Sequence, residues 1–249
     1  MVEPKKSGII ENWLEKLEKY KISHKDGFYI IPTLFNSPEI MVEGVHRIPF
    51  TKFNKETNSH HFDLFFMKTN AYYHKLEEGF WVVVSDFKFK ANTAIKNIYD
   101  EKSPTDYHFI NIFINDMTEE ETFKQKRPMI ADKEVLVNNT WTIFKPAKAK
   151  IAYYFKDTLN KNVTILFNNQ WLSQQQALTD NEKFPTITHF FHSDTEDIVL
   201  CDPEYSDPDS PNFYDRLIRL IHSDSPKKNE VIHATVLGND LLFHGFART

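Results

Sequence analysis

Glycine and cysteine are scarce in this sequence. Six glycines occur in 249 residues, and neither G-x-G-x-x-G nor G-x-x-x-x-G-K-[ST] is present. A glycine loop that cradles phosphate groups is therefore not expected. The single cysteine, Cys201, leaves no disulfide within the chain, which fits a reducing compartment. We interpret Cys201 as a buried, inert thiol, with a nucleophilic role as the alternative.

Long apolar runs and an excess of positive charge are also missing. No stretch reaches the roughly 18 apolar residues of a transmembrane helix, and the first residues lack the apolar centre of a signal peptide. The formal net charge is −5, with both signs interspersed, whereas DNA-binding domains carry a basic stripe or patch. We therefore expect a cytoplasmic protein that has no membrane partner and no DNA-reading element of its own.

Aromatic residues are abundant. The chain has 22 phenylalanines, and 41% of its residues are hydrophobic, which predicts a packed core rather than a disordered chain. Near the N-terminus, Ile9, Ile10, Trp13, Leu14 and Leu17 recur at helical spacing. This stripe predicts an amphipathic helix over residues 9–21.

The middle of the chain has the pattern of a β domain. Short runs of β-branched and aromatic residues alternate with turn-like breaks, which predicts about eight strands. These strands are expected at residues 62–67, 72–76, 80–90, 107–115, 133–137, 141–145, 151–156 and 163–168. Such regular spacing is typical of an antiparallel barrel or a sandwich, so the fold class is mainly β with some α.

After residue 168 the apolar pattern becomes helical. Helices are expected at residues 170–178, 212–222 and 229–243, and the last two resemble an αα-hairpin. Phe213, Leu217, Leu220 and Ile221 share one stripe of that hairpin. We therefore divide the chain into residues 1–168, a β domain with an N-terminal helix, and residues 169–249, a helical region.

No catalytic or metal motif stands out. The chain has 11 histidines but no H-x-H and no H-E-x-x-H, and the adjacent His60 and His61 would point to opposite faces of a strand. No G-x-S-x-G is present, and the acidic clusters at 119–121 and 194–197 are typical of solvated loops. We predict no metal, no cofactor and no enzymatic activity.

The aromatic residues on the strands suggest a pocket for a small ligand. Pockets of this kind are lined mainly by apolar and aromatic side chains with a few polar groups, although any single ring more often fills a core. The candidate lining residues are Trp81, Phe109, Phe113, Trp141, Phe144, Tyr153 and Phe155. His108 or Lys145 could orient the ligand.

Three short motifs carry a resemblance to a known family. They are W-T-I-F-K-P at 141–146, Y-Y-F-K at 153–156 and F-N-N-Q-W-L at 167–172. With their surroundings, over about residues 60–175, they resemble the N-terminal effector-binding and dimerisation domain of AraC-type (AraC/XylS) transcriptional regulators. The resemblance implies a cupin-like antiparallel β-barrel that binds a small molecule, followed by dimerisation helices.

In that family a C-terminal pair of helix-turn-helix motifs reads DNA. The sequence stops at Thr249, where that half would begin, so we expect contact with DNA only through a domain absent from this chain. Dimerisation is expected through Phe213, Leu217, Leu220 and Ile221, giving a homodimer.

The main hypothesis is therefore an effector-sensing and dimerisation domain. It would bind a small apolar or amphiphilic molecule in the barrel and pass its state to a DNA-binding domain. Two alternatives remain open, a cupin-class metal-dependent enzyme and a small hydrophobe carrier.

Overall fold

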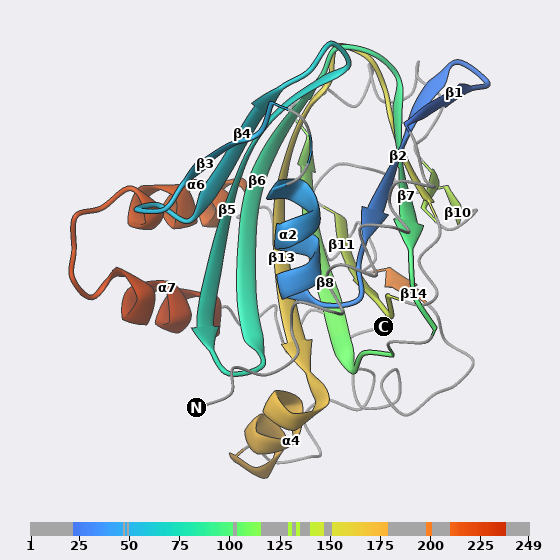
Figure 1. The fold of residues 1–249 in the computed structure, drawn as a ribbon. Coiled ribbons are helices and arrows are strands. Elements are labelled where there is room, and N and C mark those ends of the chain that lie inside the picture. The colour runs from blue at the N-terminus through green and yellow to red at the C-terminus, as the bar shows by residue number, and fades with distance from the viewer. Residues whose placement is uncertain are drawn as a thin grey trace, which may run out of the picture.

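The computed structural model describes residues 22–46, 48, 50–101, 104–115, 129–130, 133–134, 140–146, 151–178, 198–200 and 210–237. The expected N-terminal helix at 9–21 lies outside these residues. The strands form two sheets that face each other (Figure 1), which confirms a mainly β fold with a few helices. Within this part of the chain, no helix is both long enough and apolar enough to cross a membrane.

The larger sheet is antiparallel, and the described residues give it eight strands. In their order across the sheet, they are β14 (Ile198–Leu200), β11 (Thr140–Phe144), β8 (Tyr107–Asn115), β13 (Leu159–Asn168), β6 (Phe80–Phe89), β5 (Met67–Glu77), β4 (Ser59–Asp63) and β3 (Lys52–Asn54). The central strand β13 pairs with β6 on one side and with β8 on the other, along almost all of its length.

The smaller sheet has six strands within the described part of the chain. They are β1 (Ser23–Lys25), β2 (Phe28–Leu34), β7 (Thr93–Ile98), β12 (Ile151–Tyr154), β9 (Met129–Ile130) and β10 (Lys133–Glu134). Strands β2 and β7 run parallel. The β1–β2 hairpin turns at Asp26 and Gly27, whose φ angles of 51° and 81° match the positive values that a type I′ turn needs.

Helix α2 (Pro38–His46) packs against both sheets (Figure 1). Its Met41 belongs to a buried cluster with Val83 and Phe109 of the larger sheet, and its Val45 packs on a second cluster that contains Ile31 of β2. The Ser37 hydroxyl accepts a hydrogen bond from the Ile40 amide at 3.3 Å, which caps the start of the helix.

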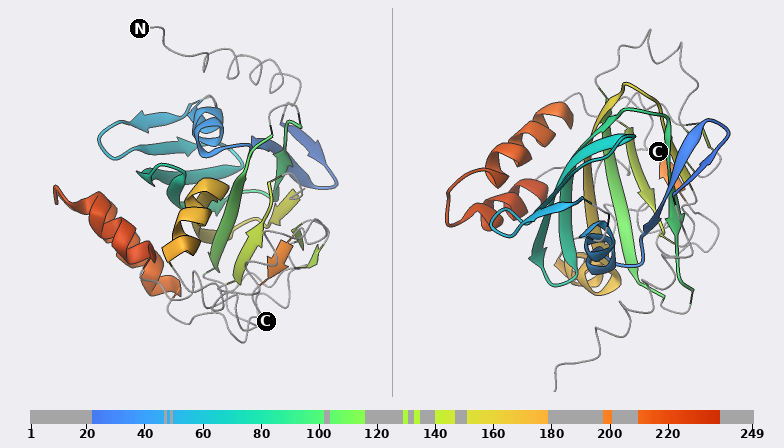
Figure 2. Two further views of the ribbon diagram at one scale, coloured as in Figure 1. Left: turned by 90° about the horizontal axis from the view of Figure 1, so that it is seen from below. Right: turned by 45° about the horizontal axis from the view of Figure 1, so that its top comes forward.

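Three further helices follow β13 among the residues that the structure describes. Helix α4 (Asn169–Leu178) continues directly from that strand, and α6 (Ser210–Ile221) and α7 (Lys228–Leu237) form a hairpin. Figures 1 and 2 show α6 and α7 on the face of the larger sheet that points away from the smaller one. They cover the main core, in which Val163, Ile165 and Phe167 of β13 pack with Leu217 of α6 and Val236 of α7.

The expectation of a closed barrel is not met by the residues that the structure describes. Their strands divide between two hydrogen-bonded sheets, an arrangement closer to the sandwich that the sequence pattern also allowed. The strand expected at 62–67 is wrong as well. The chain turns there between β4 and β5, and the Leu64 amide donates to the Met67 carbonyl at 2.8 Å.

The stripe expected to join two subunits is largely buried within the chain. Phe213, Leu217 and Ile221 are 8%, 0% and 1% exposed, and Leu220 packs against the same core. These side chains already bury their apolar surface on the sheet of their own subunit. A dimer formed through them would require α6 to leave that sheet.

We predict that Leu217→Ala lowers the free energy of unfolding by roughly 2–5 kcal/mol, because the change leaves a cavity in a closed core. Chemical denaturation measures this loss, and light scattering after size-exclusion chromatography measures the oligomeric state. A variant of unchanged stability that dissociates into monomers would instead show that Leu217 serves a subunit interface.

Candidate functional site

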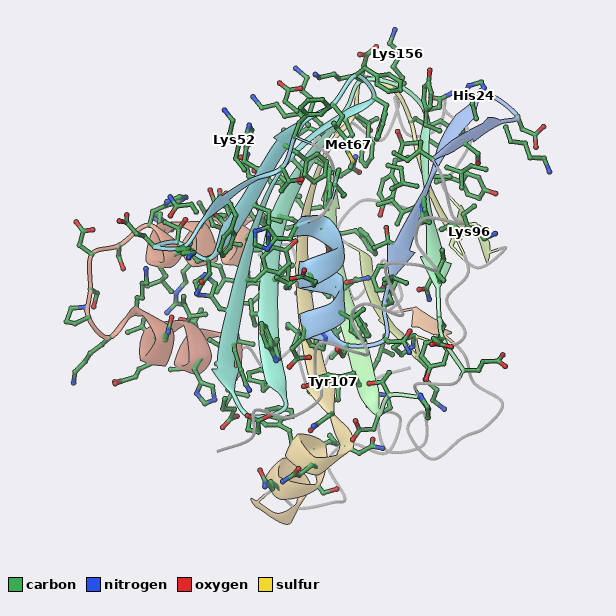
Figure 3. All side chains as sticks on the ribbon, in the orientation of Figure 1. His24, Lys52, Met67, Lys96, Tyr107 and Lys156 are labelled. Carbon is green, nitrogen blue, oxygen red and sulfur yellow. The ribbon has the colours of Figure 1, made fainter. Side chains whose placement is uncertain are left out.

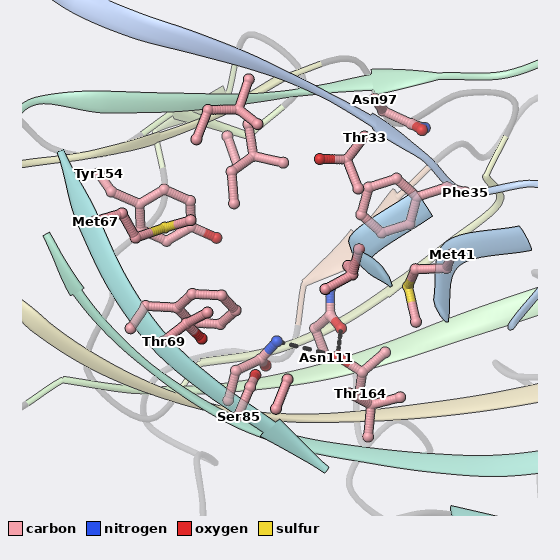
Figure 4. Close-up of a pocket in the computed structure, with 18 of the residues that line it drawn as sticks. Thr33, Phe35, Met41, Met67, Thr69, Ser85, Asn97, Asn111, Tyr154 and Thr164 are labelled. Carbon is pink, nitrogen blue, oxygen red and sulfur yellow. Dashed lines mark hydrogen bonds between the residues drawn. The ribbon is translucent and has the colours of Figure 1, made fainter. Parts of the chain in front are cut away.

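A cavity of about 170 Å³ lies between the two sheets. Strands of both sheets and helix α2 contribute its walls (Figure 4). An apolar cavity of roughly 150 Å³ is known to admit benzene. The space is therefore large enough for a small organic molecule about the size of one ring.

The two ends of the cavity are apolar. At one end, Phe35 and Met41 face the space, and at the other Met67 and Tyr154 do so (Figure 4). These residues belong to the two clusters that pack between the sheets. The apolar ends would favour a ligand that is largely hydrocarbon.

Polar side chains cross the wall that the larger sheet contributes. We call them the polar stripe, which consists of Thr142, Asn111, Thr164, Asn162 and Ser85. Thr142 is the cross-strand partner of Asn111, Asn111 of Thr164, and Asn162 of Ser85. Because paired residues point to the same face of a sheet, the stripe occupies two neighbouring rungs of the inner face.

Hydrogen bonds connect three members of the stripe. The Asn162 amide nitrogen donates to the Thr164 hydroxyl at 3.0 Å, and that hydroxyl donates to the Asn111 amide oxygen at 2.7 Å (Figure 4). On the opposite wall, Thr33 and Asn97 are paired across β2 and β7. Polar groups therefore face the cavity from both sheets.

Charge is missing from the cavity walls that the structure describes. None of their residues is Lys, Arg, His, Asp or Glu, and burial raises the pKa of Tyr73 and of Tyr154 above the usual range of a phenol. In Figure 3, Lys52, Lys96 and Lys156 lie at the periphery of the molecule. The walls are thus polar in places but carry no formal charge at neutral pH.

His60 lies next to the cavity, beneath the end of α2. It is 0% exposed, and neither ring nitrogen has a hydrogen-bond partner among the described residues. Its ring lies 4.7 Å from that of His46 and 5.0 Å from that of Tyr73. Burial, with a smaller contribution from His46, lowers the pKa of His60 to about 4.

The neighbouring His61 faces the other way. Its Nδ1 lies 2.7 Å from the Asn70 side-chain oxygen, as the alternation of a strand predicted. Across the described parts of the chain, no group of three or more His, Cys, Asp or Glu side chains is placed to hold a metal ion.

Of the aromatic residues proposed as lining, Phe113 faces the cavity. Phe109 is fully buried beside it, in the cluster against which Trp81 packs. Tyr153 and Phe155 instead contact the ring of Phe28, at 5.2 and 5.8 Å.

The remaining candidates lie elsewhere or outside the described atoms. The His108 ring lies 2.7 Å from the Asn169 side-chain oxygen, measured from Nε2, and is not part of the cavity wall. Lys145 is not part of the wall either. Trp141 and Phe144 are described in their backbone only, within β11.

The residues of the polar stripe were not among those predicted to line a pocket. Its signal was present, because Asn111 interrupts the apolar set Phe109, Asn111, Phe113 on one face of β8. An amide side chain that lies between aromatic rings on an inward face needs a hydrogen-bond partner inside the protein or on a ligand. In β12 the missed residue is Tyr154, which lies one position from the predicted Tyr153 and therefore on the opposite face.

The F-N-N-Q-W-L motif is a packing element. The Asn168 side chain accepts a hydrogen bond from the Trp171 amide at 2.8 Å and so caps α4. The Trp171 ring stacks on Phe80 at 4.3 Å, and its indole N–H donates to Glu77. Gly79 has a φ of 75°, and a Cβ there would lie 2.3 Å from the Asn168 side-chain oxygen. The turn at Gly79 therefore has no room for a side chain.

Comparisons with known proteins give weak similarities only. No protein-family model matches the chain, and no curated protein matches its sequence. Among solved structures, it is similar to the AraC-like transcriptional activator CuxR, with 8% identity and a TM-score of 0.38 over 69% of this chain and 55% of that one. It is also similar to ToxT from Vibrio cholerae, with 10% identity and a TM-score of 0.34 over 69% of this chain and 58% of that one.

The chain thus spans a little over half the length of both regulators. At these TM-scores the similarity supports no conclusion about function. The proposal below therefore depends on the cavity and on the sequence motifs.

We predict that stability falls as the pH drops from about 6.5 towards 4. Burial lowers the pKa of both His60 and His74 to about 4 in the folded chain, against about 6.5 when unfolded. The unfolded chain therefore binds more protons in this range, which destabilises the fold. Chemical denaturation at pH 7 and at pH 5 measures how much unfolding free energy is lost between the two. This loss should be about 1–2 kcal/mol smaller for His60→Phe than for the parent chain. An unchanged loss would mean that His60 is not held neutral by the fold.

Proposed function

We propose that this chain is a ligand-sensing domain of a transcriptional regulator, which binds a small apolar or amphiphilic molecule between its two sheets. The cavity is the observation that carries the proposal. It combines apolar ends with a few polar groups that face one another across the space. This composition is typical of sites for small organic molecules.

The regulatory part of the proposal rests on the motifs at 141–146, 153–156 and 167–172, which resemble those of AraC-type effector domains. In that reading the two-sheet body corresponds to the cupin-like barrel of the family. Helix α2 is the element placed to report occupancy, because Met41 and Val45 line the cavity. A ligand shifts a conformational equilibrium only by its difference in affinity for the two states. The DNA-binding step would belong to a domain outside this sequence.

The proposal includes a homodimer, as the same resemblance implies. Because the apolar stripe of α6 is buried in its own subunit, a second copy would meet the exposed faces of α6 and α7. Asp215 and Arg216 of α6 and Val231 of α7 are among the exposed residues of these helices.

A plain carrier of small hydrophobic molecules is the second candidate, because the same cavity serves it. The two functions differ in what binding does to the protein. A sensor changes its conformation or assembly when the ligand binds, whereas a carrier needs no such change. Hydrogen exchange over α6 and α7, which supply none of the described lining residues, distinguishes them when it is measured with and without ligand.

We predict that Ala71→Leu abolishes ligand binding. Ala71 is 5% exposed and lines the cavity, so a larger side chain occupies space that the ligand needs. Native mass spectrometry of protein purified without denaturation should detect a small molecule bound to the parent chain and none bound to the variant.

The matched control is Ala234→Leu, the same substitution at an exposed position of α7. It should retain the parent's ligand. If Ala71→Leu folds and still carries the molecule in parent amounts, the ligand lies elsewhere and the proposed site is wrong.

A further inference from the structure

We propose that the cavity selects an uncharged ligand with at least one hydrogen-bonding group, and that it rejects carboxylates and ammonium ions of the same shape. This inference rests on the proposed function, because it names the chemical class that the same site would take.

The charged side chains next to the polar stripe point away from the inner face of the larger sheet. Asp86 and Lys161 lie next to stripe residues in sequence, yet their side chains point to the opposite face. Asp86 accepts hydrogen bonds from Asn70 at 3.0 and 3.1 Å, and the Lys161 ammonium lies 3.8 Å from Asp215 of α6. Strand alternation therefore keeps the formal charges of β6 and β13 outside the cavity.

A charged ligand would bind weakly in this cavity. An ion that enters the space loses its hydration, and none of the described lining residues carries an opposite charge. Transfer of an ion without a partner is strongly unfavourable. We expect a carboxylate to bind at least about 100-fold more weakly than a neutral molecule of the same size.

The polar stripe distinguishes a polar neutral ligand from a hydrocarbon. Thr164 is its centre, since its hydroxyl accepts from Asn162 and donates to Asn111. Asn and Thr side chains offer both donors and acceptors, so a hydroxyl or an amide of the ligand can be matched. One such hydrogen bond improves affinity by roughly 3- to 10-fold.

Three probes built on one benzene ring test the proposal on the full chain. Benzamide and benzoate have the same shape and differ in charge, and toluene has the ring without the polar group. NMR titrations at pH 7 should give the tightest binding for benzamide, roughly 3- to 10-fold weaker binding for toluene, and at least about 100-fold weaker binding for benzoate.

Variants of the stripe then locate the effect. Thr164→Val keeps the shape of the side chain and removes both hydrogen bonds, so the preference for benzamide over toluene should fall towards equality. Thr164→Ser retains the hydroxyl and should retain the preference. Thr235→Val, a buried threonine of α7 that does not line the cavity, is the matched control and should behave as the parent. Ser85→Ala tests the same stripe if Thr164→Val does not fold.

The outcomes separate the two proposals. If none of the three probes binds, the site does not take small molecules and the proposed function fails together with this inference. The inference about ligand class is wrong if benzoate or toluene binds as tightly as benzamide. It is also wrong if the stripe variants keep the full preference for benzamide over toluene. In each of these cases the cavity still takes ligands.

Discussion

The alternation of side chains along β13 is the constraint on which the rest of the structure depends. This strand pairs with β6 on one side and with β8 on the other, so its two faces become the two faces of the larger sheet. Val163, Ile165 and Phe167 point outward into the core beneath α6 and α7. Asn162 and Thr164 point inward and line the cavity. A shift of register by one residue would exchange the two sets and destroy both.

This division of the sheet separates the main apolar core from the cavity. A cavity of about 170 Å³ costs on the order of 4 kcal/mol relative to a filled core. The outer layer offsets that cost, because helices α6 and α7 bury Leu217, Ile221, Ile232 and Val236 almost completely on the sheet. The outer face thus carries the main core, and the inner face carries the two smaller clusters and the walls of the cavity. A molecule that fills the cavity would recover part of the cost.

The sequence predicts the long, regular elements best. Strands β6 and β8 and helices α4 and α6 appear close to their expected positions. The two strands are long apolar runs between turn-like breaks, and α6 has a strong helical period. The parallel pairing of β2 with β7 was not predicted, since it joins segments far apart in the chain. The lining was mostly missed for a related reason. In β12 both faces are apolar, so periodicity could not tell that Tyr154, rather than Tyr153, faces the cavity. The stripe was missed because rings, not amides, were taken as the mark of a pocket.

The space between the two sheets is a cavity that a small molecule can enter. A crystal of the protein held under xenon pressure tests it most directly, because xenon occupies apolar cavities without needing a specific contact. The account predicts xenon density between β8 and β13 on one side and β7 and β12 on the other. Side chains packed together across that space, with no xenon between the sheets, would contradict it.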